Sequence, residues 1–164
     1  WFKEVGRTGL HGLIKPGHVV VTDAGSSGEV GFWGSNNSME VMAAGGAGIV
    51  TDGYCRDTAE VTLQKTPICA RARGRTIIPG RIMTVEVEAP VGCGGAHVRP
   101  GDMVGCDDDG VIVVPQEIAE EAAIHARAIL LADMKDRANL YRKLGLPADD
   151  TVNVEMVEAY YAAL

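Results

Sequence analysis

The chain has 164 residues, of which 46% are hydrophobic and only 5% aromatic, with 21 glycines and a formal net charge of −7. This length suits one domain with a real core, and the glycine content favours a turn-rich mixed structure of short strands over a helical bundle. The negative charge argues against a nucleic-acid partner, because binding a phosphate backbone needs clustered Lys and Arg. No apolar run is long enough to span a bilayer and no signal peptide opens the chain, so we predict a cytoplasmic protein without membrane contact.

The first part of the chain predicts a buried strand and then a helix. Residues 18–22 form the strand, and residues 26–32 are typical of a glycine-rich linker. A helix then begins within GSNNSMEVMAAGG, either with Asn37 as the N-cap and Glu40 completing a capping box, or with Ser35 as an earlier cap. A helix start presents unpaired amides and the positive end of the dipole, so a carboxylate could dock there; an ordinary cap without a ligand is the alternative.

Residues 39–57 organise the rest of the sequence. The helix gives way to a strand at residues 49–51, Asp52-Gly53 closes that strand as a turn, and the loop beyond it carries Arg56 and Asp57. Ligands usually bind at the carboxyl ends of strands in mostly parallel sheets, so this pair lies where chemistry is expected. The structural alternative is that Asp57 caps the next helix and Arg56 pairs with a nearby acid.

A basic stretch interrupts this acidic chain between residues 66 and 81. Its four arginines are Arg71, Arg73, Arg75 and Arg81. We expect them to form a solvated face or a subunit contact, and a polyanion site is the weaker alternative.

The second half predicts short strands followed by a long helix. The strands are expected at residues 82–88, 96–99, 103–106 and 111–114. The acidic run at residues 107–109 lacks the distal Glu of a calcium-binding loop, so we predict a turn there. Residues 116–144 form one helix ended by Gly145, and its excess length is expected to pack on a neighbouring subunit.

The cysteines lack any C-x-x-C pair, so the sequence indicates neither a zinc site nor a redox motif. They are Cys55, Cys69, Cys93 and Cys106. We expect four free thiols, and we interpret Cys55, which lies beside the Arg-Asp pair, as a small buried hydrophobe rather than a nucleophile.

Two separated motifs carry a resemblance to a known family. GGAGIVTDGYCRD at residues 45–57 and PVGCGGAHVRPGDMVGCDDDGVIVVP at residues 90–115 resemble the RraA-like family. That family includes the class II 4-hydroxy-4-methyl-2-oxoglutarate / 4-carboxy-4-hydroxy-2-oxoadipate aldolases and the regulator of ribonuclease E activity. The resemblance implies an α/β fold of the layered β/β/α swivelling-domain type, with short parallel and antiparallel strands and a long C-terminal helix. It also implies a single domain over residues 1–164 with a helical C-terminal arm at residues 116–164, and nothing here corresponds to the family's N-terminal segment.

The resemblance also implies a site. In the resembled aldolases the pyruvate moiety contacts, largely through main-chain amides, the positions of Gly34, Ser35, Asn36 and Asn37. The Arg of the Arg-Asp pair, here Arg56, holds the carbonyl or enolate oxygen of the substrate, and Asp57 ligates a divalent metal, Mg²⁺ or Mn²⁺, largely through water. These residue types suit the tasks, because a guanidinium offers forked donors and magnesium prefers one or two carboxylates with retained waters. Family aldolases commonly place an acid where this chain has Ser35, and the change points to weaker metal binding or a different substrate.

The activity implied by the resemblance is metal-dependent release of pyruvate, by cleavage of a 4-hydroxy-2-oxo dicarboxylate or by decarboxylation of oxaloacetate. Arg56 and Asp57 would be the catalytic residues. The resemblance further implies a homotrimer or a pair of trimers, with sites between subunits. The alternative, which Ser35 favours, is a non-enzymatic regulator that docks on a ribonuclease.

Overall fold

The computed structural model describes residues 10–25 and 29–163. The chain divides into two compact units, Trp1–Gln116 and Glu117–Leu164, and each is described by itself. After a 3-10 helix at Leu10–Gly12, the elements of the first unit are β1 (Val19–Thr22), β2 (Gly31–Trp33), α1 (Ser35–Ala43), β3 (Gly48–Cys55), α2 (Thr58–Leu63), β4 (Ile68–Arg73), β5 (Val91–Cys93), β6 (Ala96–Val98), β7 (Met103–Asp107) and β8 (Gly110–Val114).

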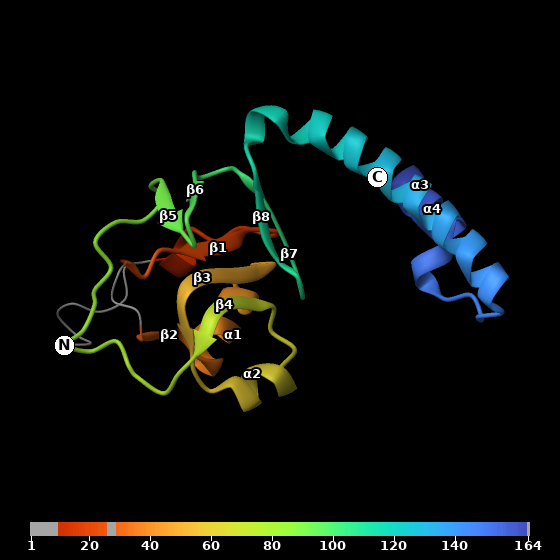
Figure 1. Cartoon of the computed structure of the whole chain (residues 1–164). Helices are drawn as coiled ribbons and strands as arrows, with labels where there is room; N and C mark the ends of the chain where they lie inside the picture. The colour runs from red at the N-terminus through yellow and green to blue at the C-terminus, as the bar shows by residue number, and fades with distance from the viewer. Residues whose placement is uncertain (1–9, 26–28, 164) are drawn as a thin grey trace. The chain divides into compact units, whose positions relative to one another are not determined.

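Strand β3 is the centre of a four-stranded parallel sheet. Strand β1 pairs with its first half, from Gly48 to Thr51, and β4 pairs with it from Ile49 to Cys55. Strand β2 pairs with its last residues, Tyr54 and Cys55. Strand β1 is almost entirely apolar and β3 is buried along most of its length, which is typical of parallel strands that are covered on both faces. Two antiparallel hairpins, β5–β6 and β7–β8, complete the strands (Figure 1).

Neighbouring side chains of β3 point into two different cores, because successive residues of a strand face opposite sides. Ile49 packs with Val41 of α1, whereas Val50 packs with Cys93 and Val98 of the hairpin β5–β6. Helices α1 and α2 therefore cover one face of the sheet and the hairpins cover the other (Figure 1). The layered β/β/α arrangement predicted from the resemblance is confirmed.

The predicted turn at Asp52-Gly53 is wrong, because β3 continues through both residues to Cys55. The Asp52 carboxylate accepts a hydrogen bond from the Ala24 amide at 2.7 Å. A Cβ atom on Gly53 would lie 2.8 Å from the Ala24 Cβ. At Asp52-Gly53 the strand therefore passes close to Ala24, and its pairing with β4 shifts register between Thr51 and Tyr54.

Two other segments differ from the prediction. Residues 82–88 form no strand, since no described strand pairs with them, and Val85 is 88% exposed. In the predicted linker, Gly31–Trp33 forms β2, with Trp33 only 3% exposed in the core. Residues 26–28 lie outside the described residues.

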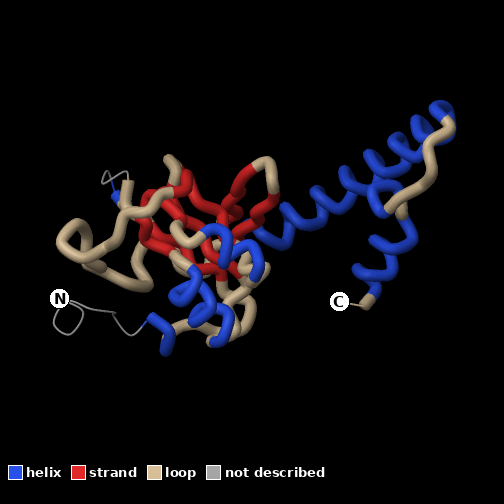
Figure 2. Tube along the Cα trace, turned by 90° about the horizontal axis from the view of Figure 1, so that it is seen from below, coloured by secondary structure: helices blue, strands red, loops and turns tan. Residues whose placement is uncertain are grey.

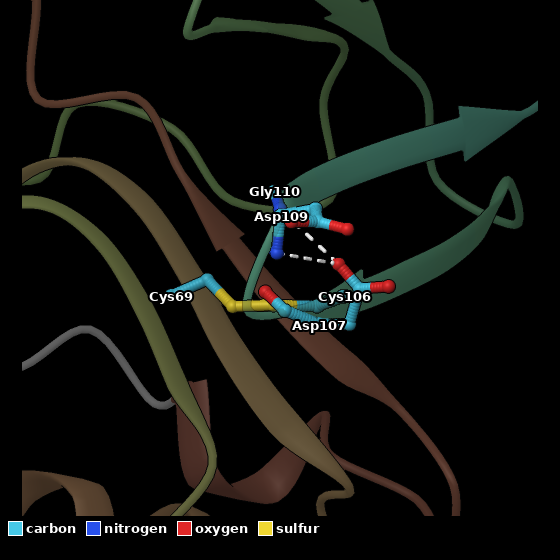
Figure 3. The surroundings of a disulfide bond; sticks show 5 residues. All are labelled: Cys69, Cys106, Asp107, Asp109 and Gly110. Carbon is cyan, nitrogen blue, oxygen red and sulfur yellow. Dashed lines mark hydrogen bonds between the residues drawn. A yellow bond between two sulfur atoms is a disulfide. The ribbon is translucent and has the colours of Figure 1, made fainter. Parts of the chain in front are cut away.

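Three of the four hairpin strands follow the prediction closely, whereas β5 (Val91–Cys93) was not predicted. Strands β6, β7 and β8 coincide with the expected strands to within one residue at either end. The turn between β7 and β8 is closed by the Asp107 carboxylate, which accepts hydrogen bonds from the amides of Asp109 and Gly110 at 2.9 and 3.2 Å (Figure 3). The acidic run is therefore a turn, as expected.

The expectation of four free thiols is wrong for two of them. Cys69 of β4 and Cys106 of β7 form a disulfide across 37 residues of sequence (Figure 3). Cys55 and Cys93 are free and buried. The pairing depends on the hairpin β7–β8 lying over the start of β4, which cysteine spacing in the sequence does not reveal.

The second unit is helical (Figure 2). Helix α3 (Ala119–Leu144) follows a 3-10 turn at Gln116–Ile118 and ends as predicted at Gly145, whose φ of 67° suits a left-handed cap. A 3-10 turn at Asp150–Val152 leads into α4 (Val154–Ala162). No helix among the described residues is both long and apolar enough to cross a bilayer.

Candidate functional site

The loop after β3 carries the two residues that the sequence singled out. The Arg56 amide donates to the Trp33 carbonyl at 2.8 Å, so the end of β2 fixes the backbone of this loop. Asp57 adopts a left-handed conformation, with φ of 55° and ψ of 34°. Non-glycine residues rarely adopt this conformation, and such residues cluster at functional sites.

Arg56 and Asp57 turn toward each other. The Arg56 Nη1 donates to the Asp57 Oδ2 at 2.8 Å, and the two side chains are 34% and 32% exposed. A pair this exposed contributes little to stability, so its main effect is to orient the two groups. Asp57 does occupy the N-cap position of α2, but its side chain makes no capping hydrogen bond. The carboxylate is directed to the arginine instead of the helix.

Helix α1 begins against this pair. A Cβ atom on Gly34 would lie 2.5 Å from the Asp57 Oδ2 and 3.0 Å from the Arg56 Cγ. Since the φ of Gly34 is −147°, an extended conformation open to any residue, close packing rather than backbone strain requires glycine here. The structure therefore brings the helix start, Arg56 and Asp57 into direct contact.

The predicted cap of α1 is wrong. Gly34 is the N-cap, without a side-chain hydrogen bond, and the helix starts at Ser35. The first backbone bond runs from the Ser38 amide to the Gly34 carbonyl, at 3.0 Å. The amides of Ser35 and Asn36 precede that bond and have no acceptor within the helix. The glycine cap leaves this end of the helix without a competing side chain.

The four predicted substrate-binding residues have different environments. Gly34 and Ser35 are buried, Asn36 is exposed and Asn37 is half-buried. Ser35 is only 4% exposed and shares the buried face of α1 with Ser38 and Val41. Its hydroxyl is thus part of the helix-to-sheet packing.

A cavity of about 500 Å³ opens at the Arg56–Asp57 pair. Besides the pair, its lining consists of Cys55, Thr58, Arg73, Gly74 and Arg75. The four residues at the start of α1 do not line this cavity. Arg56 and Asp57 therefore connect the two regions, because they line the cavity and also lie against Gly34 at the start of α1. The sequence predicted that Arg73 and Arg75 form a solvated face or a subunit contact, with a polyanion site as the weaker alternative. A signal for their place in this cavity is the Arg-Gly-Arg spacing at residues 73–75.

Cys55 is a buried thiol in the wall of this cavity. Burial raises its pKa, the negative charge of Asp57 raises it further, and Arg73 and Arg56 act in the opposite direction. The net shift is upward, so the thiol stays protonated at neutral pH. The prediction that Cys55 is buried is confirmed, and its interpretation as a hydrophobe rather than a nucleophile stays a prediction.

The residues offer limited support for a divalent metal. No group of three or more His, Cys, Asp or Glu side chains within residues 10–25 and 29–163 could enclose an ion. Asp57 presents one partly exposed carboxylate. Because magnesium is commonly held by one or two carboxylates and keeps several waters, this donor fits a mostly hydrated ion at Asp57 and does not fit a closed protein cage.

Comparison with known proteins agrees with the layered fold. The family profile described as Aldolase/RraA matches residues 9–113, well over half of the chain. The chain belongs to the RraA-like family. Its sequence motifs at residues 45–57 and 90–115 both overlap the matched region.

Three RraA-like or structurally similar proteins illustrate the relationship. The 4-hydroxy-4-methyl-2-oxoglutarate aldolase of Thermus thermophilus is 32% identical over 103 residues, which cover 61% of this chain and 60% of that protein. Streptomyces coelicolor RraAS2, described as an unusual member of the RNase ES inhibitor RraA protein family, has a TM-score of 0.68 and 30% identity, covering 82% of this chain and 66% of that one. A Pseudomonas syringae protein has a TM-score of 0.72 and 27% identity, covering 89% and 66%.

The match between this chain and its relatives covers only part of their length. The chain spans 48–62% of the length of the first curated proteins that it matches. The comparison therefore identifies the family and the fold.

Proposed function

We propose that this protein is a divalent-metal-dependent carbon–carbon lyase that releases pyruvate from a 4-hydroxy-2-oxo dicarboxylate or from oxaloacetate. The observation that supports this proposal most directly is the contact between the start of α1 and the Arg56–Asp57 pair, where a Cβ atom on Gly34 would be 2.5 Å from the Asp57 carboxylate. Several relatives are named for this aldolase activity, including the Thermus thermophilus protein.

Both reactions pass through the enolate of pyruvate, so they place the same requirement on the site. The bond between C3 and C4 of the substrate breaks, its electrons form the enolate of pyruvate, and C3 then takes up a proton. In the aldol substrate the 4-hydroxyl loses its proton and an aldehyde or ketone leaves, whereas oxaloacetate loses carbon dioxide. In each case negative charge develops on the C2 oxygen, so the site must stabilise that oxygen.

The residues at the site have distinct roles in this proposal. The amides of Ser35 and Asn36, at the positive end of α1, bind the C1 carboxylate. The Arg56 guanidinium donates to the C2 oxygen and stabilises its developing charge. Asp57 orients Arg56 through the 2.8 Å ion pair and would hold the divalent cation, whose contribution when bound is Lewis-acid polarisation of a carbonyl.

The test is pyruvate production from oxaloacetate and from 4-hydroxy-2-oxoglutarate, with magnesium or manganese and with or without a chelator. The proposal predicts a rate above the uncatalysed background that chelation abolishes. The matched control is the Asp57→Asn variant, which keeps the size of the side chain and removes the charge. Activity that survives in both chelator and Asp57→Asn would contradict the metal-dependent role.

A regulator that docks on a ribonuclease is the second candidate. It is favoured by the buried, uncharged Ser35 at a position where the resembled aldolases carry an acid. The structural similarity to Streptomyces coelicolor RraAS2 is consistent with it. If neither substrate yields pyruvate with any divalent metal, this second candidate becomes the better account.

A further inference from the structure

Two arginines that the proposed reaction leaves unused line the cavity beside the Arg56–Asp57 pair. Arg73 is the last residue of β4, and Arg75 follows it by two positions. Both line the same cavity of about 500 Å³ as Arg56 and Asp57. A volume of this size lies within the usual range for small-molecule sites.

The backbone directs both arginines to the same side. Strand pairing places Arg73 beside Cys55, and the Gly74 amide donates to the Cys55 carbonyl at 3.0 Å. A Cβ atom on Gly74 would collide with the ring of Tyr54, so the position between the two arginines faces that ring. Because side chains alternate along a strand, Arg73 projects to the opposite side, where Cys55 also lies, and Arg75 lines the same cavity as these two residues.

The cavity has an excess of positive charge inside an acidic protein. Arg56 is already paired with Asp57. Among the residues that the structure describes, no carboxylate lies within ion-pair distance of Arg73 or Arg75. Two guanidinium groups without a carboxylate partner among the described residues therefore line the cavity of a chain whose formal charge is −7. Forked guanidinium donors suit a planar carboxylate.

We propose that Arg73 and Arg75 bind the distal carboxylate of a 4-hydroxy-2-oxo dicarboxylate. This inference rests on the proposed function, in which the helix start holds the C1 carboxylate and Arg56 holds the C2 oxygen. The far end of the substrate then extends past the shared Arg56–Asp57 pair into the cavity. The two arginines select aldol adducts that keep a carboxylate on the departing fragment, and they give no advantage to substrates without one.

The test compares two pairs of compounds that differ only in the distal carboxylate. The substrates are 4-hydroxy-2-oxoglutarate, which yields pyruvate and glyoxylate, and 4-hydroxy-2-oxopentanoate, which yields pyruvate and acetaldehyde. The non-reacting ligands are 2-oxoglutarate and 2-oxopentanoate, measured by calorimetry in magnesium. The variants are Arg73→Gln, Arg75→Gln and their combination, and Arg71→Gln is the control because Arg71 lies on the same strand but lines a different cavity.

The double variant should bind 2-oxoglutarate at least about tenfold more weakly and leave 2-oxopentanoate unchanged, as expected for the loss of charge-assisted hydrogen bonds. Its kcat/KM should fall to a similar degree for the dicarboxylate alone, and Arg71→Gln should change neither. Equal losses for both ligands, or no loss for 2-oxoglutarate, would overturn the inference. If the native chain releases no pyruvate, the proposed reaction fails, and the ligand comparison still decides whether the arginines recognise a distal carboxylate.

Discussion

Replacing Gly34 by alanine tests the site geometry with one carbon atom. The added Cβ would lie 2.5 Å from the Asp57 Oδ2 and 3.1 Å from the Arg56 Cζ, where ordinary contact begins at 3.4 Å. The carboxylate must therefore retreat by about 0.9 Å, and a misplacement of about 1 Å in a catalytic group costs roughly 100-fold in rate. We expect Gly34→Ala to lower the kcat for pyruvate release by about that factor.

The stability of the variant should change much less. The backbone of Gly34 is extended, so alanine adopts it without strain, and weakening the N-cap costs about 1 kcal/mol or about 3 °C in Tm. Gly92→Ala is the control, because its Cβ would meet nothing closer than the Asp23 carboxylate at 3.9 Å. A coupled assay for pyruvate and a thermal unfolding curve measure the two effects. If Gly34→Ala retained native activity within a few-fold, the packing of α1 on the Arg-Asp pair would have no catalytic importance.

Three further predictions concern the pair, the disulfide and a buried acid. Arg56→Ala should lower turnover by roughly 100-fold or more, because it removes a donor placed where charge develops; unchanged turnover would refute its role. Cys69→Ser should lower the free energy of unfolding, measured with denaturant, by about 4 kcal/mol, the chain-entropy estimate for a loop closed across the 37 residues to Cys106; a loss below about 1 kcal/mol would contradict that estimate. The side chain of Asp102 is 3% exposed, and its pKa is lowered chiefly by the hydrogen bond that the Arg99 amide donates to its Oδ2 at 2.9 Å. The ionised Asp102 carboxylate stabilises the folded state above its unfolded pKa of about 3.9, and this stabilisation is lost as the pH falls through the lower folded pKa. The difference in Tm between the native chain and Asp102→Asn should therefore disappear in acid. A difference that does not depend on pH would contradict this.

The central features of the fold follow from local sequence patterns. Residues 49–51 predict a strand of a mostly parallel sheet with Arg56 and Asp57 in the loop beyond it, although the strand itself continues to Cys55. The short strands of the hairpins and the glycine-terminated long helix are equally local, because turn residues and periodicity define them.

The features that sequence reasoning missed depend on contacts between distant segments. The Cys69–Cys106 disulfide needs the hairpin β7–β8 to lie over β4, and Arg73 acquires its place only because β4 pairs with β3 beside Cys55. The alternation at residues 82–88 predicted a strand, but a strand also needs a neighbour, and the described chain offers none. Local patterns thus identify elements, whereas pairing partners determine which of them form a site.

The most direct test of the proposed site is a crystal structure of the chain with magnesium and pyruvate. The account predicts the pyruvate carboxylate at the amides of Ser35 and Asn36, with the keto oxygen about 3 Å from the Arg56 guanidinium. Pyruvate bound elsewhere, or bound at the start of α1 with Arg56 directed away from the keto oxygen, would contradict it.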